Sequence, residues 1–239
     1  MLGRRVAREM LSRGHDVRVL SRRSAEHPVD LRTGDGLDRA LAGCDVVIDA
    51  ANGRTPKQAR ATLVDGGRLL LAAEDRAGVP HHVCVSLVGC DRVPLGYFRV
   101  KAEQERVVEH GAVPWSIVRA TQFHEFVTTG FDLLRRWRVL PMPGALMQTV
   151  ACGDAARAIA DVAEGAPLGK RVEVAGPEVV DARVLARTWR AITRYRVMIL
   201  PVWVPGRLGR SLRSGVLISP EADVRGTTTY ADWLTAQQW

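Results

Sequence analysis

Tyr97 and Lys101 form a Y-x-x-x-K pair in a chain that contains only three tyrosines and three lysines. Because both residue types are so scarce, a match to this spacing is rare by chance. Four residues apart on a helix, the phenol and the ammonium lie on one face. A nearby cation lowers the pKa of a tyrosine, which suits proton exchange with a carbonyl or an alcohol. The spacing alone fits an exposed Tyr–Lys pair on an amphipathic helix equally well.

The elements that would position this pair follow an alternating order. Short apolar runs alternate with longer helical stretches, which is typical of βαβ units and a parallel sheet. The segments expected as strands are 15–20, 45–51, 82–87 and 115–119, and those expected as helices are 3–13, 37–41, 56–77 and 97–110. Gly66 and Gly67 are candidates to interrupt the helix over 56–77. The pattern predicts an α/β fold with a doubly wound, Rossmann-like parallel sheet.

After residue 121 the alternation becomes less regular. Helices are expected over 122–137, 154–163, 181–192 and 204–215 and from 233 to the end, with a turn-rich loop over 141–144 and a short strand over 172–174. We therefore predict two regions. A Rossmann-like domain spans 1–150, and a small C-terminal substrate-binding region spans 151–239.

Polar residues follow four successive predicted strands. They are Arg22 and Arg23, Asn52, Ser86 and Thr121. Ligands of doubly wound sheets bind outside the carboxyl ends of the strands. One such residue means little, because Asn52 also fits an Asn-Gly turn and Ser86 a strand-end serine bonded to backbone. Four on successive strands predict a nucleotide site.

Arg22 and Arg23 lie 19 and 20 residues after Gly3. At this distance a dinucleotide-binding fold carries an acid for the ribose hydroxyl or an arginine for a 2′-phosphate. Here Ser21-Arg22-Arg23 follows the predicted strand, with no acid. A guanidinium pairs bidentately with phosphate, so the pattern favours NADP(H) over NAD. The alternative is two solvated arginines in an arginine-rich chain.

Composition limits the remaining classes of function. The 239 residues are 46% hydrophobic and 25% charged, as in an ordinary globular protein, and no run approaches the length of a membrane span. The four cysteines are widely spaced, which indicates free thiols and a cytoplasmic location rather than a disulfide or zinc framework. The net charge of +8 comes from scattered arginines, which does not favour nucleic acid and fits a small anionic ligand.

The histidines do not predict a metal site. His81 and His82 are adjacent in a predicted strand, so their side chains point to opposite faces. We therefore expect no metal. His124 follows the strand over 115–119, where it fits either a substrate pocket or a partly buried, hydrogen-bonded position.

Several segments together carry a family resemblance. They are LGRRV (2–6), RGHDVRVLSR (13–22), DAAN (49–52), SLVGCD (86–91), Y-x-x-x-K (97–101) and RATQFH (119–124). With these segments the chain resembles the atypical short-chain dehydrogenase/reductases of the NmrA-like, NAD(P)-binding group. The resemblance covers nearly the whole chain and is most specific up to about residue 130.

The resemblance implies a Rossmann domain that binds NADP(H) and a small C-terminal lobe that shapes a pocket for a small-molecule substrate. Tyr97 would be the acid/base, Lys101 would hold the nicotinamide ribose and lower the Tyr97 pKa, and Ser86 would be the third polar partner. Asp30 and Leu31 match the segment that borders the adenine. The residues assigned to the cofactor are Gly3, Ser21, Arg22, Arg23, Asp30, Leu31, Ala51, Asn52, Lys101 and Thr121.

The implied reaction is hydride transfer between the nicotinamide and a carbonyl, quinone or alcohol. Because some family members bind the dinucleotide without turnover, a redox-sensing regulator with a protein partner stays open, as does an inactive truncated paralogue. One departure from the family concerns the N-terminus. Gly3 matches the third glycine of a G-x-x-G-x-x-G turn, and the first strand and the first two glycines are missing before it. We expect that the true start lies upstream.

Overall fold

The structure is a computed structural model that describes residues 2–53 and 55–237. Its contacts divide the chain into two compact units with interleaved segments. The first unit comprises Met1–Ser86, Leu95–Val118 and Ala156–Val172, and the second comprises Leu87–Pro94, Arg119–Ala155 and Glu173–Trp239. The boundary expected at residue 150 stays a prediction about domains.

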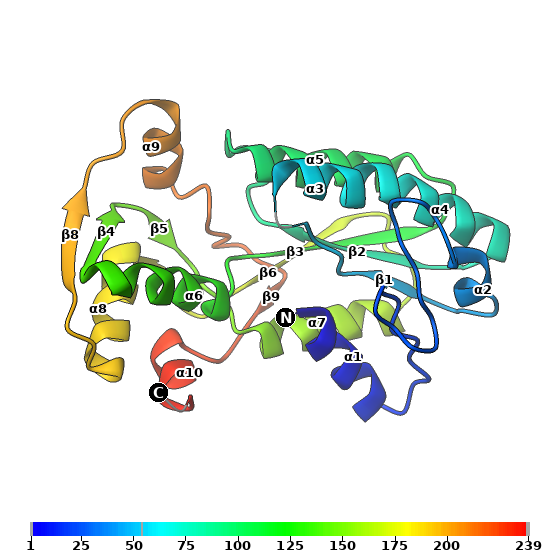
Figure 1. The fold of residues 1–239 in the computed structure, drawn as a ribbon, viewed down its shortest axis with the longest axis horizontal. Coiled ribbons are helices and arrows are strands. Elements are labelled where there is room, and N and C mark those ends of the chain that lie inside the picture. The colour runs from blue at the N-terminus through cyan, green and yellow to red at the C-terminus, as the bar shows by residue number, and fades with distance from the viewer. Residues whose placement is uncertain (1, 54, 238–239) are drawn as a thin grey trace. The chain divides into compact units, whose positions relative to one another are not determined.

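The first unit is built from alternating helices and strands. Its elements are α1 (Leu2–Ser12), α2 (Leu37–Leu41), β1 (Val47–Asp49), α3 (Pro56–Ala59), the π-helical turn η1 (Arg60–Asp65), α4 (Gly66–Ala77), β2 (His82–Leu87), α5 (Gly96–Glu109), β3 (Trp115–Ala120) and most of α7 (Cys152–Glu164). Figure 1 shows α3, α4 and α5 on one face of β1–β3, and α1 and α7 on the other. This arrangement confirms the predicted Rossmann-like α/β fold.

The five-stranded parallel sheet has the order β1-β2-β3-β6-β9, with β6 at Arg171–Ala175 and β9 at Val224–Arg225. In the β1–β2 pair, Val47 lies opposite His82 and Asp49 opposite Cys84. Strand β2 is buried along almost its whole length, as expected for a parallel strand covered on both faces. The polar residue Asn52 follows β1, so it lies beyond the carboxyl end of that strand.

The helices are placed by their apolar faces and their glycines. On α4, Leu70 and Ala73 pack with Leu37 and Leu41 of α2 against the β1 side of the sheet. Gly66 opens α4 where a Cβ would lie 2.7 Å from the Leu31 carbonyl oxygen, so a larger residue does not fit. Gly66 therefore admits a close neighbour, a Cβ at Gly67 would meet open space, and the helical run continues through both glycines.

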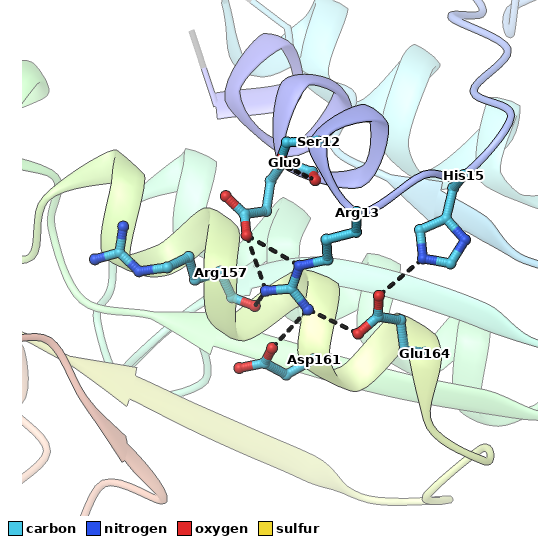
Figure 2. A network of polar contacts seen from close by, with 7 residues as sticks. All are labelled: Glu9, Ser12, Arg13, His15, Arg157, Asp161 and Glu164. Atoms are coloured by element: carbon cyan, nitrogen blue, oxygen red, sulfur yellow. Dashed lines mark hydrogen bonds and ion pairs between the residues drawn. The ribbon is translucent and has the colours of Figure 1, made fainter.

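An ion-pair network joins α1 to α7 (Figure 2). The Arg13 guanidinium donates to Asp161 and Glu164 at 2.7 Å each and to Glu9 at 2.9 Å, and the His15 ring contacts Glu164 at 2.8 Å. Hydrogen bonds donated to Asp161, Glu164 and Glu9 raise the pKa of Arg13, so it carries its charge at any working pH. The network fixes the end of α1 distant from Gly3.

The second unit forms its own core. Its further elements are α6 (His124–Leu134), the 3₁₀ turn η2 (Arg135–Trp137), β4 (Val139–Pro143), β5 (Leu146–Met147), β7 (Val180–Asp181), α8 (Ala182–Thr193), β8 (Met198–Val202), α9 (Gly206–Arg213) and α10 (Tyr230–Thr235). Trp189 is fully buried with Phe131 and Leu140 at its centre. Asp181 caps α8 by accepting the Arg183 backbone N–H at 2.8 Å.

Two sequence expectations about strands are wrong. Residues 15–20 form no strand, because no strand of the described chain pairs with them. This extended segment leads only to the isolated bridge between Ser21 and Pro28. The loop expected over 141–144 lies largely in β4, which pairs in parallel with β8. The Pro and Gly residues of this segment favour a turn, but pairing with β8, more than fifty residues away, makes it a strand. No helix in the described residues is long and apolar enough to cross a membrane.

Candidate functional site

Tyr97 lies in the first turn of α5, with its hydroxyl directed at the loop after β1. The hydroxyl donates a hydrogen bond of 2.9 Å to Oδ1 of Asn52. The same oxygen accepts the backbone N–H of Gly53 at 2.7 Å, which fixes the orientation of the amide. The phenol is half-buried. It is therefore held at the carboxyl end of β1 while solvent still reaches it.

Gly53 allows the Asn52 loop to lie against α3. A Cβ at residue 53 would be 2.3 Å from the Ala59 backbone nitrogen, a distance that no side chain tolerates. The Asn-Gly pair is thus a close backbone contact as well as a turn. It places the Asn52 amide against Tyr97, which the sequence alone left open.

Lys101 lies one turn after Tyr97 and turns inward. Its side chain is only 4% exposed. The ammonium donates to the Val85 carbonyl oxygen at 2.6 Å and to Oε1 of Gln104 at 2.5 Å. The Y-x-x-x-K residues therefore share a helix but have separate hydrogen-bond partners.

The predicted direction of the Tyr97 pKa is wrong. Burial raises this pKa, and only the Asn52 amide opposes the shift. The Lys101 ammonium does not contribute, because it is bonded to Val85 and Gln104 instead. At neutral pH Tyr97 is a protonated phenol, which is the form that donates a proton.

Ser86 lies at the end of β2, next to the strand carbonyl that Lys101 binds. Its side chain is 1% exposed. Lys101 thus holds the backbone that carries Ser86, so the three residues predicted as catalytic are grouped around α5 and the end of β2.

The residues predicted to meet the adenine half of the dinucleotide gather near the end of segment 15–20. The Val29 backbone N–H donates to the Ser21 carbonyl oxygen at 3.1 Å, which folds the Arg22–Arg23 turn back toward Asp30. Hydrogen bonds from Arg32 lower the pKa of Asp30 to about 2, and the charge of Arg22 contributes to the shift. Arg22 and Arg23 are both exposed. Two guanidinium groups are therefore available to an anion.

Gly3 lies beside Ala50, the residue that follows β1. A Cβ on Gly3 would meet the Ala50 Cβ at 3.6 Å, an ordinary van der Waals contact, so the packing alone does not require glycine there. The role predicted for Gly3, that of the third glycine in a dinucleotide-binding turn, stays a prediction. The residue following Ala50 is Ala51, whose N–H is bonded to Asp49 at 3.0 Å.

In the second unit, Thr121 and Gln122 follow β3 and carry buried polar atoms without protein partners. The Thr121 hydroxyl and both amide atoms of Gln122 make no hydrogen bond within the described structure. Buried polar atoms without partners are rare in native proteins. They fit a polar ligand group such as a dinucleotide provides, which is the role predicted for Thr121.

His124 has a structural environment. Its Nδ1 is 2.9 Å from the Thr149 hydroxyl and its Nε2 is 3.0 Å from the Thr228 carbonyl oxygen. Burial lowers the pKa of the ring, which is fully enclosed beside Tyr230. Because both nitrogens are occupied, His124 is the buried, hydrogen-bonded histidine of the two alternatives.

A buried polar group lies under β1 and β2. His82 Nδ1 contacts both Glu74 carboxylate oxygens at 2.9 and 3.0 Å, and the ligand-type atoms of Asp49, His82 and Cys84 lie within 4.8 Å of one another. The sequence reasoning considered only the neighbours His81 and His82. It missed this group because the β1–β2 register, which sets Asp49 opposite Cys84, is a property of the fold.

The parallel sheet, the helices on both faces and the strand-end polar residues define a Rossmann-like α/β protein of the dinucleotide-binding class. A family model described as NAD(P)H-binding matches residues 1–165, well over half of the 239. The chain belongs to this NAD(P)H-binding family, consistent with the NmrA-like resemblance. No curated protein matches the chain significantly.

Solved structures of similar fold include two reductases. One is a NADPH-dependent quinone oxidoreductase of Escherichia coli complexed with NADPH, at 17% identity and a TM-score of 0.81, covering 98% of this chain and 95% of that chain. Another is a triphenylmethane reductase of Citrobacter complexed with NADP(H), at 14% identity and a TM-score of 0.75, covering 99% and 96%. A nucleoside-diphosphate-sugar epimerase of Staphylococcus aureus is also similar, at 15% identity and a TM-score of 0.80, covering 98% of this chain and 96% of that chain. At these identities the likeness shows a shared fold.

Proposed function

We propose that this protein is an NADPH-dependent reductase that acts on a carbonyl or quinone, with Tyr97 as the proton donor. The observation that carries the proposal is the protonated phenol of Tyr97, held by Asn52 at the carboxyl end of β1. Membership of an NAD(P)H-binding family supports the cofactor. The similar quinone and triphenylmethane reductases support the class of reaction.

When bound, the nicotinamide supplies the hydride, and the chain supplies the proton. In the resting arrangement the Asn52 oxygen accepts a hydrogen bond from the Tyr97 hydroxyl. A substrate carbonyl oxygen takes the place of Asn52 as acceptor, and Tyr97 then transfers the proton to the forming alcohol. Because Tyr97 is half-buried, water returns a proton to the phenolate.

Further residues orient the two ligands. An ammonium has three N–H donors, and two of those on Lys101 are used by Val85 and Gln104, which leaves one for the nicotinamide ribose. Ser86 contacts the substrate oxygen from the end of β2. Within the first unit, Gly3, Ala51 and Asn52 line the dinucleotide, with Asp30 and Leu31 at the adenine.

The decisive experiment is consumption of NADPH with a panel of aldehydes, ketones and quinones. Turnover above the rate without protein supports the reductase. If NADPH binds but no compound is reduced, the better function is a dinucleotide-sensing regulator. One observation favours this second candidate. Among the described residues no cation lowers the pKa of Tyr97, so no positive charge stabilises the phenolate that proton donation leaves.

The exposed arginines should decide the choice between NADPH and NADH. Replacing Arg22 and Arg23 together with alanine should weaken NADPH binding about tenfold or more, since each charge-assisted contact to the 2′-phosphate contributes about 1.5–3 kcal/mol. Binding of NADH should change little. Calorimetry with both dinucleotides measures the two affinities.

The matched control removes two exposed arginines from α9, with Arg207→Ala and Arg210→Ala. It alters the net charge equally and should leave both affinities unchanged. Equal losses for NADPH and NADH, or equal losses in the control, would show that Arg22 and Arg23 act only through overall charge.

A further inference from the structure

Three charged or polar side chains form a continuous chain beneath the site. Asp49 is the last residue of β1 and is 6% exposed, and Gln104 on α5 is 1% exposed. The Gln104 Nε2 donates to Asp49 Oδ2 at 2.7 Å, while its Oε1 accepts from the Lys101 ammonium at 2.5 Å. The amide therefore stands between a buried carboxylate and a buried ammonium.

The two ends of this chain reach the residues of the proposed site. At one end, the second carboxylate oxygen of Asp49 accepts the Ala51 N–H at 3.0 Å, directly before Asn52. At the other end, Lys101 binds the Val85 carbonyl oxygen, directly before Ser86. Asn52 in turn holds the Tyr97 hydroxyl. All of these residues belong to the first unit.

The orientation of the Gln104 amide is set by charge. With its nitrogen toward the carboxylate and its oxygen toward the ammonium, both contacts are favourable, and a reversed amide would make both repulsive. A buried charge that loses its partner is strongly destabilising. The arrangement therefore has one stable orientation, which is suited to fixing the groups at its ends.

We propose that Asp49 and Gln104 are positioning residues of the reductase site. They hold the Asn52 loop and the Lys101 ammonium in fixed positions relative to Tyr97. The inference rests on the proposed function, and neither residue touches the reacting atoms. Asp49 and Gln104 come from segments 55 residues apart, joined by one hydrogen bond. Disturbing that bond displaces both ends at once.

The test exchanges the two functional groups. Asp49→Asn alone leaves one oxygen for two donors, so the new amide nitrogen meets either Gln104 Nε2 or the Ala51 N–H. Gln104→Glu alone sets two carboxylates against each other. The double variant Asp49→Asn/Gln104→Glu restores every contact, and only the hydrogen bond between positions 49 and 104 reverses its direction. The new amide at position 49 can still accept the Ala51 N–H, and the new carboxylate at position 104 faces Lys101 directly. Matched controls are Asp65→Asn and Gln58→Glu, both at exposed positions.

We expect each single variant to lower kcat for carbonyl or quinone reduction by about 10- to 100-fold, because small displacements of reacting groups cost that much. The Kd for NADPH should change less. The double variant should fold, and its kcat should return close to the wild-type value. Single variants with wild-type kcat, or a double variant that fails to fold or stays slow, would overturn the proposal.

A second measurement does not depend on turnover. With ¹³Cζ-labelled tyrosine the chain gives three signals, one each from Tyr97, Tyr195 and Tyr230. The Tyr97 signal should move in each single variant and return in the double variant, while the other two stay in place. If the wild type reduces nothing but the Tyr97 signal behaves in this way, the proposed reaction fails and the positioning role stands. An unmoved Tyr97 signal in a folded single variant contradicts it.

Discussion

Replacing Tyr97 with phenylalanine should lower turnover of a carbonyl or quinone by about 10²–10⁴-fold, the usual contribution of general acid catalysis. The ring still packs on α5, and only the transferable proton is lost. The affinity for NADPH should stay near the wild-type value, since no proposed cofactor contact comes from the phenol alone. Steady-state kinetics with NADPH in excess, together with calorimetry, measures the two effects separately.

The control is Tyr195→Phe, at a partly buried position packed against the core of the second unit, which should leave turnover unchanged. The pH profile adds a second criterion. Burial raises the pKa of Tyr97, so the donor form persists through neutral pH, and the wild-type rate of reduction should fall only above the ordinary tyrosine pKa of about 10. Tyr97→Phe should lack this decline. A phenylalanine variant that is as fast as the wild type would make the Y-x-x-x-K pair a coincidence of the helix surface.

The sequence predicts the α/β alternation well, because it depends on local periodicity. Strand β2 and the helix that carries Tyr97 both follow from patterns within a few residues. The segment over 15–20 and strand β4 do not, since a strand forms only where a partner strand lies beside it. The residues within a segment do not show whether a partner strand lies beside it in the fold.

In the candidate site too, local sequence predicts some features, and contacts with distant residues decide the others. The spacing of Tyr97 and Lys101 correctly places both on α5, and the position of Asn52 after β1 is visible in the sequence. The direction of the Lys101 side chain is not, because Gln104 and the Val85 carbonyl attract the ammonium inward. The sign of the Tyr97 pKa shift follows from that direction. A short motif therefore identifies the residues but not their electrostatics.

Glu74 and His82 should control stability in the first unit. Both side chains are almost completely buried, with His82 Nδ1 contacting both carboxylate oxygens. Replacing Glu74 with leucine leaves His82 without this partner and should cost about 3–5 kcal/mol of unfolding free energy at neutral pH. The double variant Glu74→Leu/His82→Leu removes the pair and should recover most of the loss, since apolar replacements of buried pairs are often neutral.

The pair should also give stability a defined pH dependence. Burial opposes the charge on His82, but Cys84 and Glu74 outweigh it and raise its pKa to about 10, and burial raises the pKa of Glu74. Both shifts mean that the folded state holds its protons more tightly than the unfolded state. Stability from the His82 shift is therefore fully present below about pH 6.5 and is lost as the pH rises through about 10, and stability from the Glu74 shift is fully present below about pH 4.5 and is lost as the pH rises through the raised pKa of Glu74.

Urea unfolding at pH 6.5 and at pH 10 tests this dependence. The wild type should lose more stability between the two pH values than the double variant, in which all other titrating groups are retained. Glu221→Leu, at an exposed position, is the control and should follow the wild type at both pH values. If the double variant loses as much stability as the wild type at pH 10, the alkaline decline arises elsewhere. If Glu74→Leu is as stable as Glu221→Leu, the buried pair does not hold the first unit together.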